Sequence, residues 1–324
     1  MLSSPRRNYL QPIADASVDA SEFEYIRTLG ASATGEILVA RKADTGQVHT
    51  VKLVRKSGHN ADGLATRIRR EQKILQVLTE CRVPFVVTLF WSFEDGRAMY
   101  LVIDRTDERN LRNAVEKQGP LLAHEAICCA AELAEGISGL HALGIVHAQL
   151  MPESILVAED GHILISDFDD ASFLSDDAER LLVAQHRPSL DSQEYLAPEL
   201  ILGWEYDYAV DWWSFGLVVF WILTGTHPFV RQSDAGHPEI IRAKVLHAEL
   251  THDHLGMSED AYGLISRCCQ RNPALRIDGL GVKMHQYFST MSVPSQLVIC
   301  SSTIITDLCV LQNLGRCRHE EARR

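Results

Sequence analysis

The pattern of hydrophobic residues changes close to residue 104, and this change limits the possible folds more than any other feature of the sequence. Before it, short runs rich in β-branched and aromatic residues alternate with turns, as β-strands do; they are residues 25–29, 36–41, 48–54, 85–93 and 98–103. Residues 65–78, in the same part, have helical periodicity. After the change, residues 122–143 and the strongly apolar residues 211–224 indicate long helices, the second one buried. We therefore expect an α+β fold of two lobes with a hinge near residues 103–106.

Length and composition agree with one globular unit. The chain has 324 residues, 46% of them hydrophobic and 23% charged, which suffices for a two-lobed domain with a full core. The net charge of −12 argues against a nucleic-acid surface. The apolar residues 296–311 are few for a membrane span and include Asp307, which favours a docked or disordered tail. We therefore expect no nucleic acid and no membrane among the partners.

The N-terminus and the cysteines bear on the compartment. Residues 1–20 include Arg6 and Arg7 with no apolar run behind them, so we expect a flexible arm rather than a secretory signal. The 8 cysteines show no zinc spacing, and two adjacent pairs lie in apolar helical patterns, where a thiol is usually a small core side chain. These features predict a reducing compartment, namely the cytoplasm, with the nucleus as the alternative.

Two glycines and a lysine in the strand-rich part suit phosphate chemistry. In LGASATGEI (residues 29–37), Gly30 and Gly35 permit backbone amides to approach phosphate oxygens, although Ser32 stands between them. A β-turn with two glycines is the simpler explanation of the same pattern. Lys52 lies on the inward face of an expected strand, where a lysine is costly unless paired, and Glu71 in the following helix is a candidate partner. The alternative is that both side chains are exposed.

Further motifs follow in the helical part. HAQLMPESIL occupies residues 147–156, and a buried strand runs into the acidic turn of ILISDFD at residues 163–169. EYLAPE at residues 194–199, VDWWSFG at residues 210–216 and RNPALR at residues 271–276 come next. Together with the glycine turn and Lys52, they form seven matches in one order over residues 23–288, and such an ordered set is far more specific than any one motif.

This set resembles the eukaryotic protein kinases, most closely the serine/threonine kinases of the AGC group. The resemblance implies a two-lobed protein-kinase fold: a small antiparallel β-sheet with helix C in an N-lobe (residues 21–105) and a larger, mostly helical C-lobe (residues 106–288). Residues 1–20 would be the arm and residues 289–324 a C-terminal tail. The aromatic motif of the AGC tail is not recognisable after Phe288.

The resemblance also implies roles for individual residues. Those implied to hold ATP are Gly30, Gly35, Ile37, Lys52, Glu71, Asp104 and Leu156. Asp167 would ligate Mg²⁺. Asp169 replaces a glycine, tolerates left-handed backbone, and would add a carboxylate beside the metal. Glu199 should pair with Arg276, and Asp211 should bind the backbone of the catalytic loop. Four residues would form an internal apolar spine: Leu75, Leu89, His147 and Phe168.

Three substitutions in the catalytic loop argue against efficient phosphoryl transfer. Gln149 replaces the catalytic aspartate, and an amide cannot take a proton near neutral pH, a loss typically costing roughly 10²–10⁴ in rate. Met151 replaces the lysine beside the transferred phosphate, and Ser154 replaces the asparagine that binds the second metal. Ala148 stands in place of the arginine that receives an activating phosphate, and the aligned phosphorylation position is Pro188.

Three functions remain open at this point. The leading one is a pseudokinase, that is, a scaffold or allosteric protein partner that holds ATP and Mg²⁺ without appreciable transfer. The second is a weakly active serine/threonine protein kinase acting on a protein substrate, in which Asp169 or Asp170 supplies missing metal ligands. The third is an interaction protein with an empty pocket, which Ser32 and Thr50 favour because both narrow the nucleotide site.

Opposite charges suggest how the acidic turn is held. The segment after the turn is acidic, and the expected helix at residues 65–78 is basic; its cations are Arg67, Arg69, Arg70 and Lys73. We hypothesise that these side chains fix the segment in place of a phosphate. The alternative is two separately solvated surfaces, because exposed ion pairs contribute little.

Overall fold

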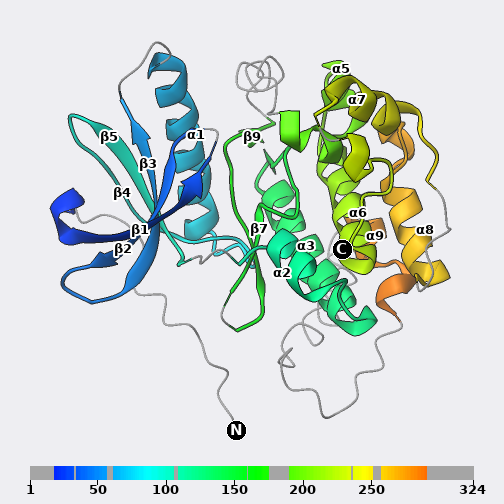
Figure 1. Cartoon of the computed structure of the whole chain (residues 1–324), viewed down its shortest axis with the longest axis horizontal. Coiled ribbons are helices and arrows are strands. Elements are labelled where there is room, and N and C mark those ends of the chain that lie inside the picture. Colours follow the sequence, from blue (N-terminus) through cyan, green and yellow to red (C-terminus); the bar gives the residue numbers. More distant parts are fainter. Residues whose placement is uncertain are drawn as a thin grey trace, which may run out of the picture.

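A computed structural model describes residues 18–32, 34–56, 61–105, 109–158, 160–174, 190–234, 236–250 and 257–289. Of the expected N-terminal arm, residues 1–17 lie outside this part of the chain, as does the C-terminal tail from residue 290 onward. The described part forms two lobes, a β-sheet lobe and a helical lobe (Figure 1). The expected α+β class and the two-lobed arrangement are confirmed.

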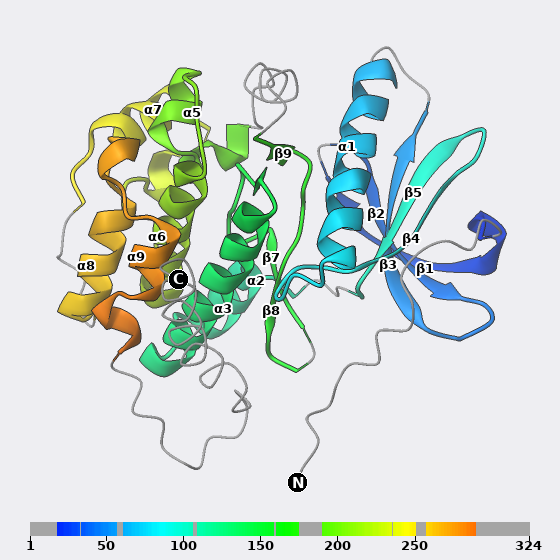
Figure 2. The same ribbon diagram turned by 180° about the vertical axis from the view of Figure 1, so that it is seen from behind.

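The N-lobe is a five-stranded antiparallel sheet with the strand order β1-β2-β3-β5-β4. Its strands are β1 (Phe23–Ala31), β2 (Glu36–Lys42), β3 (Val48–Arg55), β4 (Leu89–Glu94) and β5 (Ala98–Ile103). Helix α1 (Ala61–Glu80) lies on the side of the sheet that faces the helical lobe, as both views show (Figures 1 and 2). Ile68, Ile74 and Leu78 are almost fully buried along it, as expected for an amphipathic helix packed on a sheet.

The expected strand at residues 85–93 begins four residues later than the sequence suggests. Phe85 has a φ of 58°, which ends regular strand geometry, and β4 begins at Leu89. The residues in between join the lobes instead: Ile165 donates to the carbonyl of Phe85 at 2.8 Å, and Val87 donates to that of Ile165 at 3.0 Å. The apolar run therefore serves as a connection between lobes rather than as sheet.

The C-lobe consists of helices, with short strand pairs at the edge that faces the sheet lobe (Figure 1). Its helices are α2 (Leu111–Gln118), α3 (Ala123–Ala142), α5 (Pro198–Leu202), α6 (Ala209–Thr224), α7 (Pro238–His247), α8 (Glu259–Cys268) and α9 (Gly279–Lys283). Its short strands are β6 (Ile145–Val146), β7 (Ile155–Val157), β8 (Ile163–Ile165) and β9 (Ser172–Phe173). The 3-10 turns are η1 (Ala20–Glu22), η2 (Leu190–Tyr195), η3 (Gln232–Asp234), η4 (Pro273–Leu275) and η5 (Gln286–Phe288).

Helix α6 is the core of the C-lobe. Every residue from Val210 to Ile222 is buried, which explains why its sequence is apolar all round rather than on one face. Gly216 permits α8 to pack closely, because a Cβ there would lie 2.6 Å from the Cβ of Cys268. Cys268 and Cys269 are buried at this contact, in agreement with their expected role as core side chains.

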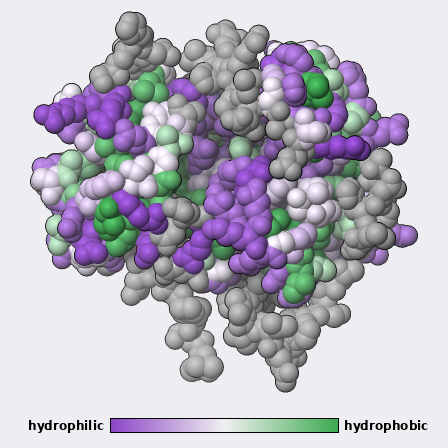
Figure 3. Space-filling view, viewed as in Figure 1, coloured by the Kyte–Doolittle hydropathy of each residue, from purple (hydrophilic) through white to green (hydrophobic). Residues whose placement is uncertain are grey.

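The face of the molecule seen in Figure 3 has a mostly polar surface. Hydrophilic residues prevail there, and hydrophobic ones form small separate groups (Figure 3). Within the described residues, no helix combines the length and the apolar character needed to cross a membrane.

Candidate functional site

The site is built around the ammonium group of Lys52 on β3. Lys52 and Glu71 are only 4% and 3% exposed, and Lys52 Nζ lies 3.0 and 2.7 Å from the two carboxylate oxygens of Glu71. The alternation of β3 turns Lys52 inward, and α1 places Glu71 opposite it. A buried lysine needs such a partner. The alternative interpretation, in which both side chains are exposed, is therefore wrong.

A second carboxylate, from Asp169 in the acidic turn, reaches the same ammonium group. Lys52 Nζ makes a short ion pair with Asp169 Oδ1, and the hydroxyl of Thr34 donates to the same oxygen at 2.7 Å. Asp169 and Thr34 are both buried. One carboxylate therefore joins β3, the glycine turn and the acidic turn.

The glycine turn folds back on the side chain of Ser32. The amides of Thr34 and Gly35 lie 3.3 and 3.2 Å from Ser32 Oγ, to which they donate, and Ser32 N donates to the carbonyl of Gly35 at 2.7 Å. Gly35 is required by packing, because a Cβ there would collide with the carbonyl of Leu53. At Gly30, a Cβ would meet no atom within 4 Å, so packing does not explain that glycine.

Helix α1 holds the acidic turn in part as hypothesised from charge. Arg67 Nη2 lies 2.8 Å from Asp170 Oδ1, and Arg70 Nη2 donates to the backbone carbonyl of Asp169 at 2.9 Å. Lys73 instead lies 5.1 Å from the ring centroid of Phe173. The expectation for Arg69 is wrong, since its exposed side chain lies 3.6 Å from Glu94 on β4. The acidic residues after position 174 lie outside the described residues.

Asp167, the expected metal ligand, adopts the left-handed conformation that the sequence suggested for Asp169. Its φ is 63°, whereas Asp169 is not among the described non-glycine residues with positive φ. The side chain of Asp167 is exposed, while that of Asp169 points to Lys52. The carboxylate that Asp169 adds therefore contacts the ammonium group of Lys52, whereas the sequence indicated a place beside the metal. Among the residues that the structure describes, no three His, Cys, Asp or Glu side chains are grouped to hold a metal ion.

The carboxylates around one ammonium group compete for its charge. Burial raises the pKa of Glu71 to about 8, and Lys52 opposes that rise only in part. Burial also acts to raise the pKa of Asp169, but the nearby Lys52 outweighs it, and the net shift is downward. Burial lowers the pKa of Lys52, yet Glu71 and Asp169 outweigh it, so that the net shift is upward. Asp169 thus stays ionised, and Glu71 is the group of the two that takes up a proton first.

The catalytic loop has a firm backbone and altered side chains. Asp211 of α6 accepts from the amides of His147 and Ala148 at 2.9 and 2.8 Å, as expected, and this stabilises Ala148 at a φ of 64°. His147 lies 2.9 Å from the carbonyl of Ser166 through Nε2, and its ring centroid is 4.9 Å from that of Phe168. The expected spine contact between these two residues is present, and both residues are fully buried.

The three altered positions of this loop are not equivalent. Gln149 is half-buried, and Met151 packs as a half-buried side chain against the hydrophobic core. The hydroxyl of Ser154 is used inside the loop: it donates to the carbonyl of Met151 at 2.9 Å and accepts from the amide of Met151 at 3.1 Å. Ser154 therefore closes a turn, which occupies the oxygen that sequence reasoning considered as a metal ligand.

The remaining expected nucleotide residues are Ile37, Leu156 and Asp104, of which Asp104 lies in the expected hinge. Ile37 is the register partner of Lys52 on the adjacent strand, and Leu156 on β7 forms a bridge with Asn110 just before α2. Asp104 follows β5 directly, and its carboxylate accepts from the amide of Thr88 at 2.5 Å. These residues come from the two lobes and the segment between them, as the resemblance implied.

Sequence reasoning missed Thr34 and Arg112. Thr34 was detectable only as a hydroxyl residue between two glycines. Arg112 on α2 forms a close ion pair with Glu153 of the catalytic loop and lies 3.3 Å from Glu194. Arg112 belongs to no recognisable sequence motif. Only the fold shows that it neutralises the carboxylates of Glu153 and Glu194.

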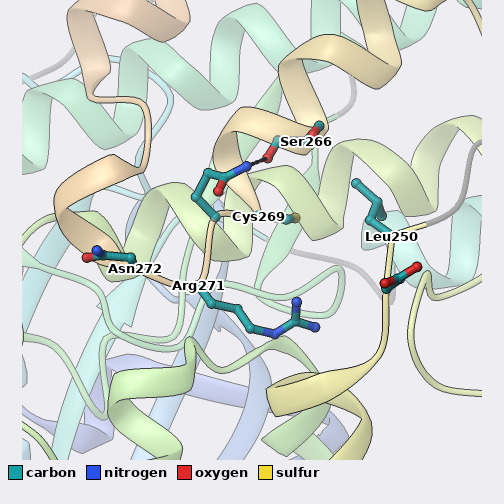
Figure 4. Close-up of a pocket in the computed structure, with 7 residues that line it drawn as sticks. Leu250, Ser266, Cys269, Arg271 and Asn272 are labelled. Atoms are coloured by element: carbon teal, nitrogen blue, oxygen red, sulfur yellow. Dashed lines mark hydrogen bonds between the residues drawn. The ribbon is translucent and has the colours of Figure 1, made fainter.

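A separate cavity of about 380 Å³ lies in the C-lobe, far from this site in the sequence and the fold. It is lined mainly by the end of α8 and the residues after it, and Arg271 extends toward its Leu250 side (Figure 4). Arg271 already donates to the carbonyls of Val245 and Ala248 at the end of α7. Its contacts are therefore those of a structural residue that joins α7 to α8.

Comparison with known proteins decides the family. The model of the protein kinase domain matches residues 23–288. The chain belongs to the protein kinase family. The chain is 32% identical over 298 residues to the probable serine/threonine protein kinase IRE4 of Arabidopsis thaliana, covering 84% of this chain and 28% of that protein. It is 31% identical over 283 residues to human ribosomal protein S6 kinase alpha-3, covering 84% of this chain and 36% of that protein.

A third relative agrees with these two. Serine/threonine-protein kinase AtPK2/AtPK19 of Arabidopsis thaliana is 29% identical over 281 residues, covering 85% of this chain and 56% of that protein. The chain thus spans well under two thirds of the length of these serine/threonine kinases. The similarity to S6 kinases agrees with the AGC-like resemblance of the motifs.

Protein kinase domains in general bind ATP with Mg²⁺, and the described residues of this domain fit that pair poorly. Lys52 already carries two carboxylates, the glycine-turn amides are bonded to Ser32, and the Ser154 hydroxyl closes a turn. Asp167 is the one expected metal residue that faces solvent. A bound triphosphate would have to break several of these contacts.

Proposed function

We propose that this kinase domain is a pseudokinase, a scaffold or allosteric partner of other proteins with negligible phosphoryl transfer. The observation that carries the proposal is Gln149 in a catalytic loop whose backbone Asp211 holds in place. A rigid loop leaves the amide where the proton acceptor belongs, and an amide takes no proton near neutral pH. The arrangement therefore lacks general-base catalysis of the substrate hydroxyl.

The other two loop positions support the same function. Met151 packs against the core and brings no cation to the transferred phosphate, and Ser154 uses its hydroxyl within the loop. Positioning and charge neutralisation are the main sources of catalysis in phosphoryl transfer. Both are weakened by side chains that are already engaged.

A weakly active serine/threonine kinase is the second candidate. It is favoured by the Lys52–Glu71 ion pair and by the packed contact of His147 with Phe168, both of which belong to an assembled kinase site. It requires Asp169 or Asp170 to serve as a metal ligand. Asp169 is bound to Lys52 and Asp170 to Arg67, so either would first have to leave a buried partner.

Transfer of radiolabelled phosphate from ATP to a generic basic peptide tests the choice. Wild type is compared with Lys52→Met, which removes the central cation, while an active serine/threonine kinase is assayed in parallel. We expect wild type and Lys52→Met to give the same background. A wild-type signal clearly above that of Lys52→Met, and lost in Asp167→Asn, would establish the weak kinase instead.

The partner class is proposed from the family, and the location from the cysteine pattern. Kinase domains act on proteins, so we propose a protein partner or substrate, and we place the domain in the cytoplasm, with the nucleus as the alternative. Imaging of a fluorescent fusion of the full chain tests the location.

A further inference from the structure

The phosphate end of the nucleotide site holds three carboxyl groups and one lysine. Lys52 is paired with both Glu71 and Asp169, and the exposed carboxylate of Asp167 lies two residues from Asp169 along the chain. The nearest cations of α1 are engaged as well, since Arg67 pairs with Asp170 and Arg70 binds the Asp169 carbonyl. An incoming phosphate would meet carboxylates before it met an available cation.

We propose that Asp169 fills the phosphate position of the nucleotide site, so that the site takes a phosphate-free nucleoside in preference to a nucleoside triphosphate. This inference rests on the proposed pseudokinase function and names the ligand class of the same site. A carboxylate and a phosphate oxygen make the same kind of charge-assisted contact with an ammonium group. Asp169 is part of the protein and pre-positioned, so it competes without the entropy cost of binding.

The position of Asp169 is held from three sides. Thr34 donates to its carboxylate at 2.7 Å, Arg70 donates to its carbonyl at 2.9 Å, and Lys52 pairs with it from β3. The side chain is only 2% exposed. Displacing it would leave an ionised carboxylate to be solvated elsewhere, which makes removal from Lys52 costly.

The glycine turn supplies an independent observation. In a phosphate-binding turn, backbone amides point at the ligand. Here the amides of Thr34 and Gly35 are both directed at Ser32 Oγ, at 3.3 and 3.2 Å. The chain thus satisfies with its own side chains both the cation and the amides that a phosphate would use, whereas none of these contacts involves the side chains of Ile37 and Leu156.

The apolar residues expected to hold a base are retained. Ile37 on β2 and Leu156 on β7 are half-buried apolar residues, one from each lobe. Apolar walls and backbone groups recognise an uncharged heteroaromatic ring without any need for phosphate contacts. An adenosine-like molecule is therefore the ligand class that the charges permit.

Calorimetric titration of the full chain with adenosine, with ATP, and with ATP plus Mg²⁺ tests the proposal. We expect wild type to bind adenosine at least as tightly as ATP. Asp169→Asn and Asp169→Gly, which restores the residue of the family, should bind ATP ~10-fold to 100-fold more tightly, as expected for removal of one competing charge-assisted contact. Adenosine affinity should change less than about threefold, because Ile37 and Leu156 are untouched.

Asp170→Asn is the matched control. It removes an equal charge from the adjacent position, but its carboxylate pairs with Arg67 and not with Lys52, so the preference for adenosine should persist. Wild type that binds ATP more tightly than adenosine, or Asp169 variants that leave ATP affinity unchanged, would overturn the proposal; so would wild type that binds no adenosine. A phosphotransfer signal in the peptide assay would instead refute the pseudokinase function, which the ligand ranking does not test.

Discussion

Replacing Asp211 by asparagine should destabilise the domain by about 3 kcal/mol. Asp211 is fully buried and accepts from the amides of His147 and Ala148, and its Oδ2 also lies 2.8 Å from His141 Nε2. Asparagine keeps one acceptor oxygen and places an NH₂ group against a former donor. The change removes a charged acceptor worth ~1.5–3 kcal/mol per hydrogen bond and leaves at least one buried amide unsatisfied at a cost of ~1–3 kcal/mol. Partial repacking around the new side chain should keep the total loss of stability near the lower end of these two ranges combined.

Urea titration followed by tryptophan fluorescence measures this change. With 2–4 °C per kcal/mol for a domain of this size, the melting temperature should also fall by roughly 6–12 °C. Asp207→Asn is the control, since Asp207 is exposed and accepts from the amide of Ala209 at 2.8 Å, a cap that asparagine can replace. A loss below about 1 kcal/mol in Asp211→Asn would show that these bonds do not hold the catalytic loop.

Three further perturbations test the ion pairs. Glu199→Gln should cost about 3–5 kcal/mol in urea titration, because the buried guanidinium of Arg276, now 2.6 and 3.0 Å from the two carboxylate oxygens, would lose its counter-charge; an unchanged midpoint would contradict this. Arg67→Ala should cost ~2 kcal/mol and the exposed Arg69→Ala less than ~0.5 kcal/mol, so equal losses would refute the docking of the acidic turn on α1. Because the pKa of Glu71 is raised, the folded state keeps a proton on this carboxyl group that the unfolded state releases above pH ~4.5. The free energy of unfolding should therefore fall as the pH rises toward about 8, by at most ~1.4 kcal/mol per pH unit. In Glu71→Gln this part of the slope should be absent from stability measured between pH 5 and 8.

Much of the fold was predictable because burial leaves a local record in the sequence. The apolar run of α6 indicated a fully buried helix, and Val210 to Ile222 are all buried. Charged residues within apolar surroundings had to find partners, so Glu199 with Arg276 and Lys52 with Glu71 could be anticipated from order and spacing. The strand expected at residues 85–93 failed at its first half, because an apolar run does not distinguish sheet from a connection between lobes.

The sequence by itself determined the family, the order of the elements and the amide side chain at position 149, since each of these follows from residue type and local pattern. The tertiary structure alone decided that Asp169 turns to Lys52 and Thr34 while Asp167 takes the left-handed conformation. The physical reason is distance along the chain: Thr34 and Asp169 are separated by 135 positions, and an acidic turn offers several carboxylates to one buried cation. Which of them reaches that cation depends on how the two lobes pack, and no local pattern records it.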